Sequence, residues 1–187
     1  MKKIKSLKID QSGVTLIELL ITVAVLGILI SLAVPSFTST IERRRLEGAA
    51  EELYSYLQFA RSESIKRATD VRVYFTNTAG ADWCYGLKVN ATCDCTETDS
   101  TQSDYCEIDG VKKIVNQDDH QGITINGSSQ PFSGWFAFDN RRGTAESGGV
   151  TFINSYEIRV AVSTLGRIRV CGNNDTALPD LIAYDAC

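Results

Sequence analysis

The sequence predicts an α+β protein in which one long N-terminal helix packs on an antiparallel β-sheet head that disulfides staple. An apolar run near the N-terminus leads into a segment whose apolar residues recur every three to four positions. Beyond residue 68 the pattern changes to alternation with a period of two. Six cysteines all lie after the apolar run. A length of 187 residues supports one domain beyond the N-terminal segment.

The first element is a short basic leader followed by an apolar segment. Four lysines precede Gly13, and from residue 14 to residue 34 the only polar side chains are two threonines, a serine and Glu18. About 20 apolar residues cross a hydrocarbon core of roughly 30 Å, so residues 14–35 are expected to form a transmembrane helix. The lysines predict that residues 1–13 stay in the cytoplasm. A carboxylate in such a segment costs roughly 2.5–3.5 kcal/mol, so Glu18 needs a reason.

The junction of Gly13 and Val14 resembles the class III signal of type IV prepilins. An ordinary secretory signal ends in a cleavage site of small residues after the apolar run, and none follows here. In the prepilin family a dedicated peptidase cuts after the glycine and methylates the new N-terminal residue. The resemblance implies cleavage after Gly13 and N-methylation of Val14, where most members carry Phe. It also makes Glu18 the assembly glutamate, the partner of a neighbouring subunit's amino group, and Pro35 the helix-kinking proline.

A second interpretation of Glu18 involves only local structure. Thr15 and Glu18 have the spacing of a capping box, and a carboxylate in a first helical turn satisfies free amides and the helix dipole. On this interpretation the segment is an ordinary single-pass anchor. The two interpretations are compatible, because a pilin glutamate also lies in a first turn.

The anchor continues into an amphipathic helix over residues 36–68, the spine of the head. Leu46, Ala50, Leu53, Leu57, Ala60 and Ser64 mark its apolar face. Residues 14–68 would make a helix of about 80 Å, with a curve or an interruption expected near Gly27 and Pro35. The three arginines at 43–45 are interpreted as a solvated face, with lipid contacts as the alternative.

The rest of the head, residues 69–187, is expected to be β-rich and periplasmic. Candidate strands lie at 71–75, 85–89, 122–126, 134–139, 150–154, 157–163 and 167–171. Residues 92–121 show little periodicity and are interpreted as a stapled surface insertion. Trp83 and Trp135 are expected to pack in the core or at its rim.

Composition excludes a globally basic, nucleic-acid-coating protein. Removing residues 1–13 removes four Lys and one Asp and leaves 15 basic and 22 acidic residues, a net charge of −7. Export makes disulfides the default for six cysteines, which allow 15 connectivities. Locality favours Cys171 with Cys187, and two bridges among Cys84, Cys93, Cys95 and Cys106. A zinc site made of those four thiolates is the alternative, although their spacing is unusual for zinc.

Two head segments resemble the GspH/FimT branch of the pilin superfamily. Residues 138–143, Phe-Asp-Asn-Arg-Arg-Gly, resemble a turn that often reads F-x-P-R-G in that family, and residues 165–171 resemble its last strand. The resemblance implies a minor pilin of a type IV pilus, a structural and priming subunit near the filament tip. Its partners would be other minor pilins, the prepilin peptidase and the bacterial inner membrane. The alternative is the minor pseudopilin H of a type II secretion system.

Gly166-Arg167-Ile168-Arg169 also matches the G-R-x-R motif of FimT pilins that bind DNA. In a strand, Arg167 and Arg169 point the same way, about 6.6 Å apart, and suit successive phosphates. Arg141, Arg142 and Arg159 would widen this patch if the fold brings them close. The alternative is that the arginines only decorate an exposed sheet edge. The net charge favours this alternative, as do the three aspartates and the absence of Lys and Arg in residues 173–187.

No feature of the sequence predicts catalysis, a cofactor or a metal. His120 lies in a polar loop without a second histidine or a cysteine at ligand spacing, so it is interpreted as a satisfied or solvated loop histidine. The nucleophile-elbow, zincin and P-loop motifs are absent from the sequence. The acidic residues of 94–104 do not have EF-hand spacing. The sequence therefore favours a structural subunit over an enzyme.

Overall fold

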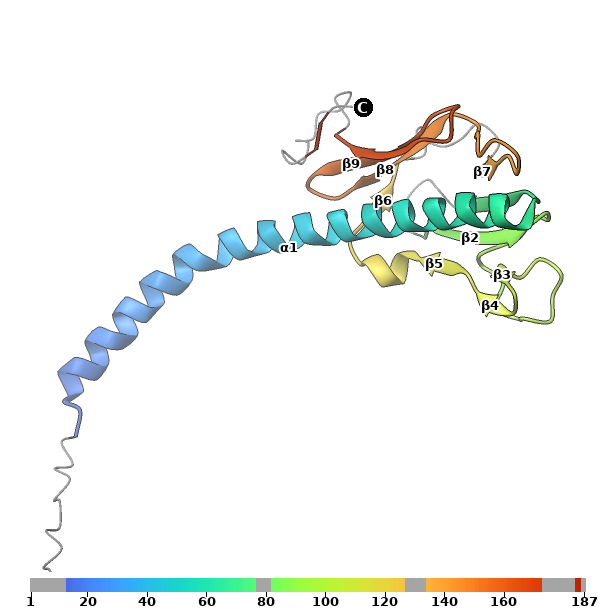
Figure 1. Ribbon diagram of the computed structural model, residues 1–187. Coiled ribbons are helices and arrows are strands. Elements are labelled where there is room, and N and C mark those ends of the chain that lie inside the picture. Colours follow the sequence, from blue (N-terminus) through green and yellow to red (C-terminus); the bar gives the residue numbers. More distant parts are fainter. Residues whose placement is uncertain (1–12, 77–81, 127–133, 173–183, 186–187) are drawn as a thin grey trace, which may run out of the picture. The chain divides into compact units, whose positions relative to one another are not determined.

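The computed structural model describes residues 13–76, 82–126, 134–172 and 184–185, without the side chains of residues 33–36. The chain forms two compact units, Met1–Thr40 and Ile41–Cys187. Helix α1 (Leu16–Arg67) belongs to both units, and its helical backbone is unbroken through Gly27 and Pro35. The predicted α+β class with one long N-terminal helix is confirmed (Figure 1).

The first unit is the apolar part of α1. Its large apolar side chains are exposed, from Val14 at 70% to Phe37 at 69%. An 18-residue window of α1 has a mean hydropathy of 2.7, which makes it the one helix of the described residues long and apolar enough to cross a membrane. An exposed surface of this kind requires lipid or protein around it, because water solvates it poorly.

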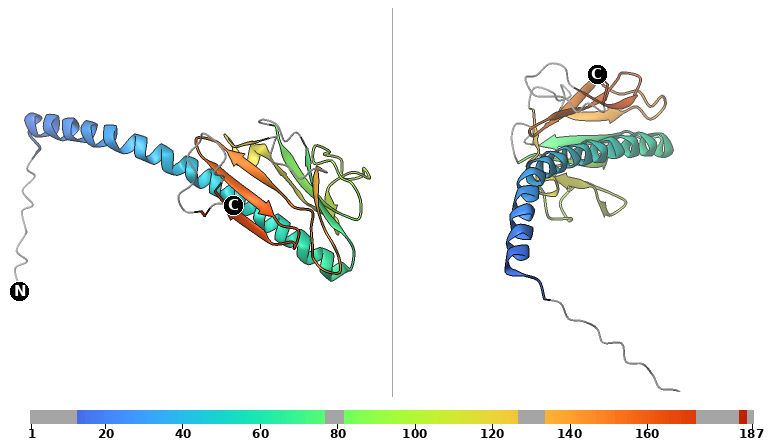
Figure 2. Two further views of the ribbon diagram at one scale, coloured as in Figure 1. Left: turned by 90° about the horizontal axis from the view of Figure 1, so that it is seen from above. Right: turned by 90° about the vertical axis from the view of Figure 1, so that its left-hand side faces the viewer.

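In the second unit, one face of α1 forms the centre of a hydrophobic core. The buried helix residues are Leu46, Ala49, Ala50, Leu53, Leu57 and Ala60. They share the core with strand residues such as Val73, Leu87, Phe136 and Val160. Figures 1 and 2 show the strands gathered around this half of the helix. Burial on one helical stripe at a spacing of three to four residues is what the sequence predicts.

Within the described residues, the β-structure consists of two four-stranded sheets and a small hairpin, where the sequence indicated one sheet. The first sheet has the order β5-β2-β1-β7, with β1 (Val71–Thr76), β2 (Cys84–Val89), β5 (Ile114–Asn116) and β7 (Trp135–Phe138). The second has the order β10-β9-β8-β6, with β6 (Thr124–Ile125), β8 (Gly148–Ile153), β9 (Glu157–Val162) and β10 (Ile168–Cys171). Strands β3 (Glu107–Ile108) and β4 (Val111–Lys112) form the hairpin. All strand pairs are antiparallel.

The segment expected to be an irregular insertion contributes to a sheet. Its β5 pairs with β2, and a 3₁₀ turn, η1 (Gln117–His120), follows directly. Strands of two or three residues are too short to show a period of two, which is why the pattern missed them. The part that precedes β3 does lie outside the named strands, and disulfides fasten it.

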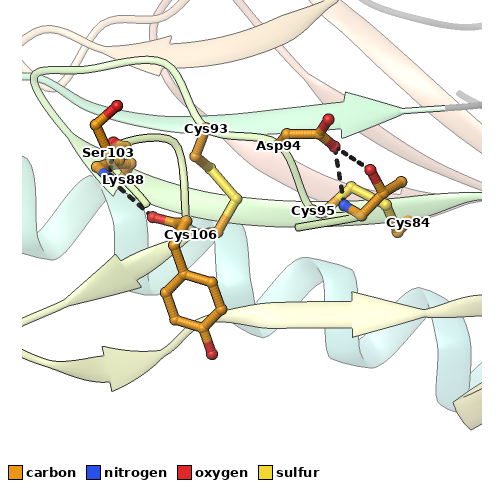
Figure 3. The surroundings of a disulfide bond; sticks show 9 residues. Cys84, Lys88, Cys93, Asp94, Cys95, Ser103 and Cys106 are labelled. Carbon is orange, nitrogen blue, oxygen red and sulfur yellow. Dashed lines mark hydrogen bonds between the residues drawn. A yellow bond between two sulfur atoms is a disulfide. The ribbon is translucent and has the colours of Figure 1, made fainter. Parts of the chain in front are cut away.

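Two interlaced disulfides fasten this insertion: one joins it to β2 and the other lies within it. Cys84 bonds to Cys95 and Cys93 bonds to Cys106 (Figure 3). The four sulfurs are therefore joined in pairs, which replaces the alternative of a four-thiolate zinc site. Cys171 is also disulfide-bonded, whereas Cys187, its expected partner, lies outside the described residues.

Close packing and a lysine hold the stapled segment. A side chain at Gly86 of β2 would lie 2.4 Å from the Cys106 sulfur, so this strand position accepts only glycine. Lys88 Nζ donates to the carbonyl oxygens of Ser103 at 2.6 Å and Tyr105 at 2.8 Å (Figure 3). The insertion is thus fixed to the sheet at several points.

The C-terminal end of α1 is tied to the β3–β4 hairpin by charge. Arg67 Nε donates to Glu63 at 2.6 Å, and its Nη1 donates to Asp109 at 2.9 Å. Hydrogen bonds from Arg67 hold the pKa of the Asp109 carboxyl below its usual value, and those from Arg67 and Lys66 do the same for Glu63. This network positions the end of the helix. The turn that carries Arg141 and Arg142 lies next to that end.

Candidate functional site

The predicted processing site lies just before α1 and is open. Gly13 has no atom within 4 Å of the position where a side chain would begin, and Val14 is exposed. Thr15 caps the helix: its hydroxyl oxygen accepts the Glu18 amide at 3.3 Å, and its carbonyl accepts the Leu19 amide at 3.1 Å. The bond between Gly13 and Val14 therefore stands outside the helix, in a backbone that a peptidase can reach. The leader residues before it lie outside the described residues.

The polar side chains of the apolar segment differ in whether they have a hydrogen-bond partner. Thr22 donates to the Leu19 carbonyl at 2.8 Å and Ser31 donates to the Ile28 carbonyl at 2.7 Å, while Thr15 serves as the cap. The Glu18 carboxylate is exposed and has no hydrogen bond or ion pair within the described part of the chain. Glu18 is thus the polar group of this segment that still needs a partner. The observed cap uses the Glu18 amide, not its carboxylate.

Pro35 lies within α1, and its side chain is outside the description. The helical backbone continues through it, which is a difference from the interruption that the sequence allowed.

The G-R-x-R residues have the predicted alternation. Arg167 directly precedes β10, and Arg167 and Arg169 are exposed, whereas Ile168 between them is 5% exposed. On the neighbouring strand, Arg169 lies opposite Ala161, and Arg159 lies opposite Cys171 on the same face of the sheet. Arg159 also lies across the backbone of Gly149, with its Nε 2.6 Å from where a Cβ would be. Three arginines therefore occupy the outer face of this sheet edge.

The turn of residues 138–143 and the turn that leads into β10 meet at Gly143 and Gly166. Gly143 and Gly166 have φ angles of 61° and 73°, in the left-handed region. A Cβ on Gly166 would lie 1.8 Å from the Gly143 carbonyl oxygen, so both positions depend on the absence of side chains. Arg61 of α1 lies against both glycines, with its Nε 3.0 Å from a Cβ built on Gly143 and 3.4 Å from one on Gly166. The sequence gives no signal for this position of Arg61, because residues 143 and 166 are far from it along the chain.

The turn that carries Arg141 and Arg142 is held by its own side chains. Asp139 Oδ1 accepts the amides of Arg142 at 2.8 Å and Arg141 at 3.0 Å, and these bonds keep the pKa of the Asp139 carboxyl below its usual range. Asn140 Nδ2 donates to the Ala68 carbonyl at 3.0 Å, at the C-terminal end of α1. Both arginine side chains are exposed. The fold thus joins the turn of Arg141 and Arg142 to the turn of Arg167 through the two glycines.

A groove runs along β10. It has a volume of about 470 Å³ and is lined by residues 167–171, Tyr54 of α1, Tyr184 and Asp185. Asp185, one of the three aspartates of the C-terminal segment, lines the same groove as Arg167 and Arg169. This surface combines basic side chains, two aromatic rings and one acidic residue.

His120 is a satisfied histidine of the core rim. Its Nε2 lies 2.6 Å from Glu52 Oε2 of α1, and its ring stacks on Trp83 at a centroid distance of 6.0 Å. Trp83 is buried and donates to the Ile123 carbonyl at 2.9 Å, whereas Trp135 is partly exposed. Within the described ranges, no group of three or more His, Cys, Asp or Glu side chains is arranged to hold a metal ion.

Two family models match the chain. The model described as "Type II transport protein GspH" matches residues 49–166, which covers most of the head. The model of the prokaryotic N-terminal methylation motif matches residues 9–34, which include Gly13, Val14 and Glu18. The chain has no significant match among curated proteins.

Three solved chains are similar in fold. The type IV minor pilin FimU of Pseudomonas aeruginosa has 20% identity and a TM-score of 0.49 over 69% of this chain and 90% of that chain. A second crystal form of FimU gives 19% identity and a TM-score of 0.47, over 67% and 91% of the two chains. The minor pseudopilin EpsH from the type 2 secretion system of Vibrio cholerae has 13% identity and a TM-score of 0.46, over 67% and 95%.

Proposed function

This chain belongs to the GspH family of minor pilins and pseudopilins, and on that premise we propose that it is a minor pilin of a type IV pilus. Its role is structural: it occupies a place near the filament tip and helps to start assembly with other minor pilins. The family consists of structural subunits, so no catalytic residue is assigned.

Glu18 is the observation that carries this proposal. It is an exposed carboxylate in the first turn of an exposed apolar helix, four residues after Val14, and every other polar side chain from 14 to 32 is satisfied within the helix. Cleavage after Gly13 creates an amino group on Val14. In a filament, the Glu18 carboxylate of one subunit pairs with the amino group of its neighbour, which offsets the cost of its burial among apolar side chains.

The proposal fixes a topology. Residues 1–13 are a cytoplasmic leader that the prepilin peptidase removes, and residues 14–35 are the inner-membrane anchor and later the filament core. Residues 36–68 are the spine of a periplasmic head that continues to residue 187. The exposed apolar surface of the first unit supports this order, as do the disulfides of the second, because disulfides persist in an oxidising compartment.

The test compares two substitutions in α1. Glu18→Val removes the carboxylate and keeps the segment apolar, whereas Thr22→Val removes a hydroxyl that is already bonded to the Leu19 carbonyl. We expect both variants to be cleaved and inserted, but only Glu18→Val to be depleted from sheared filaments, as measured by immunoblot against the membrane fraction. Equal filament incorporation of the two variants would contradict the proposed role of Glu18.

The printed family description favours a second candidate, a minor pseudopilin of a type II secretion system. A pseudopilin would use the anchor, the cleavage site and the head in the same way as a type IV pilin. A deletion phenotype is therefore needed to distinguish the two roles. A strain that lacks the chain should lose surface pili if it is a type IV pilin. Normal piliation together with a loss of protein secretion would assign it to the secretion system.

The exposed arginines favour a third role, weak DNA binding at the pilus tip. Arg167 and Arg169 lie on one face, and a phosphate backbone suits two guanidinium groups so arranged. Affinity of the full chain in detergent micelles for a DNA duplex should fall with salt and disappear in Arg167→Ala/Arg169→Ala. Arg45→Ala is the control, an exposed arginine elsewhere on the head. Equal affinity of the double variant and the control would reduce these arginines to edge charges.

A further inference from the structure

Three chain reversals meet at one end of the head: the C-terminal end of α1, the turn of residues 139–143 and the turn of residues 163–166. The Asn140 side chain bonds the first turn to the end of the helix. A backbone bond joins the strand-side ends of the two turns, because the Ala145 amide donates to the Thr164 carbonyl at 3.2 Å. We call the surface formed by these three segments the loop end.

The loop end exposes two large apolar side chains. Leu165, in the second turn, is 76% exposed, and Ile65, in the last turns of α1, is 51% exposed. Ile65 Cδ1 lies 3.2 Å from where a Cβ on Gly143 would be, and Leu165 directly precedes Gly166, which touches Gly143. Both side chains therefore flank the contact between the two turns. Water solvates such a pair poorly, so it indicates a surface that meets another apolar phase.

Four arginines adjoin these apolar side chains. Arg61 lies one helical turn before Ile65 and contacts both turns of the loop end. The other three lie within two residues of the turn glycines, and they are Arg141, Arg142 and Arg167. Within the described residues, none of the four forms an ion pair. Their charges are available to an external anion.

Three carboxylates near the end of α1 are already engaged within the protein. Asp139 accepts backbone amides of its own turn, and Glu63 and Asp109 bond to Arg67. They therefore do not neutralise the four arginines by direct pairing. The loop end is thus a basic surface on a chain that is acidic overall.

The combination of exposed apolar and basic side chains fits the boundary of an anionic membrane. Guanidinium groups form strong hydrogen bonds to phosphate oxygens. An apolar side chain at the tip of a turn can enter the layer between headgroups and acyl chains, and a fluid layer needs no complementary cavity to receive it. DNA also offers phosphates, but it would leave Leu165 in water.

We propose that the loop end binds an anionic lipid surface. Leu165 and Ile65 enter the boundary between headgroups and acyl chains, and the four arginines contact lipid phosphates. This inference goes beyond the filament role and does not depend on it, because it rests on the side chains that one end of the head exposes.

The experiment places the full oxidised chain in nanodiscs of phosphatidylcholine, which cover the apolar part of α1, and measures binding to separate immobilised vesicles by surface plasmon resonance. We expect binding to vesicles that contain phosphatidylglycerol and little binding to vesicles of phosphatidylcholine alone. Leu165→Ser should weaken binding about tenfold, the factor expected when a large apolar side chain is partly buried. Ile41→Ser is the matched control, since Ile41 is 45% exposed on the same helix and lies about 36 Å from Ile65.

A charge variant tests the arginines without disturbing their turn. Arg141→Ala/Arg142→Ala removes two guanidinium groups and keeps the backbone amides that Asp139 accepts. Each basic residue near an anionic surface strengthens binding about fivefold, so the double variant should bind about 25-fold more weakly at low salt. Equal binding of wild type to both kinds of vesicle, wild-type affinity of the double variant, or equal affinity of Leu165→Ser and Ile41→Ser would each overturn the proposal.

A second measurement reports insertion directly. Leu165→Trp places an indole at the tip of the turn, and the wild-type spectrum, which contains Trp83 and Trp135, is subtracted as background. Vesicles of phosphatidylglycerol with brominated acyl chains should quench the added emission, and unbrominated vesicles should shift it to the blue. Bound protein without quenching would mean that charge alone holds the head on the surface, and would contradict insertion.

A DNA duplex distinguishes lipid binding from the attraction of any polyanion. Leu165→Ser should lose vesicles and retain whatever affinity for the duplex the wild type shows. Wild-type binding to the duplex but not to anionic vesicles would assign the arginines to nucleic acid and overturn the proposal. An equal loss of duplex and vesicle binding in Leu165→Ser would show a damaged loop end, and would contradict a specific role of Leu165 at lipid.

Discussion

Alanine at Gly166 tests the contact that joins the two motif turns. Gly166 has a φ of 73°, and a Cβ there would lie 1.8 Å from the Gly143 carbonyl oxygen. A non-glycine residue in the left-handed region costs about 1–2 kcal/mol. Forcing an extra carbon into packed structure adds about 1–3 kcal/mol. Gly166→Ala should therefore destabilise the head by about 2–5 kcal/mol in total.

Gly110 provides a matched control for the backbone term. Its φ is 72°, but no atom lies within 4 Å of the position of its Cβ. Gly110→Ala should cost only the conformational term of about 1–2 kcal/mol. The difference between the two variants, about 1–3 kcal/mol, isolates the contact with Gly143.

Thermal unfolding of the full chain, followed by the fluorescence of the buried Trp83, measures this difference. At about 2–4 °C per kcal/mol, Tm of Gly166→Ala should lie about 2–12 °C below that of Gly110→Ala. Equal Tm values for the two variants would refute the close approach of the two turns, and with it the placement of Arg167 beside the turn of Arg141 and Arg142.

Three further predictions concern the head. Replacing Cys93 and Cys106 together by serine opens a loop that is closed by residues 13 apart in sequence. The free energy of unfolding, measured by denaturant titration, should fall by about 2–4 kcal/mol. Unchanged stability would contradict a stabilising role of this disulfide. Asn140→Ala removes the bond to the Ala68 carbonyl and should cost about 1 kcal/mol in the same assay, whereas an unaltered midpoint would show that the turn does not depend on it. Because hydrogen bonds lower the pKa of folded Asp139, its stabilising effect is fully present above the unfolded value near 4 and is lost as the pH falls through the lower folded value. Asp139→Asn should therefore flatten the acid limb of the stability profile, and an identical limb in wild type and variant would contradict this assignment.

The sequence predicted the long elements well because their patterns are long. The helix expected at 14–68 is α1 (Leu16–Arg67), and its apolar stripe is the buried face. The longer strands agree within one or two residues for the same reason: β9 (Glu157–Val162) was expected at 157–163 and β8 (Gly148–Ile153) at 150–154. Alternation over five or six residues is a signal that short elements do not provide.

Tertiary arrangement was harder to predict. No local pattern shows that β7 pairs directly with β1, although β2 to β6 lie between them in the sequence, or that the strands divide into two sheets. The sequence predicts no role for Arg61, because its contact with Gly143 and Gly166 exists only in the folded head. Cysteine spacing, by contrast, limited the disulfides: Cys93 and Cys95 are too close to bridge to each other, and each bonds elsewhere.

The N-terminus of the mature chain tests the central claim most directly. Mass spectrometry of the N-terminal peptide, from protein isolated from membranes of the native host, identifies the first residue and its modification. The account predicts a chain that begins at N-methylated Val14, and an uncleaved chain in Gly13→Val. A wild-type chain that begins at Met1 or at any residue other than Val14, or a Gly13→Val chain of mature size, would contradict it.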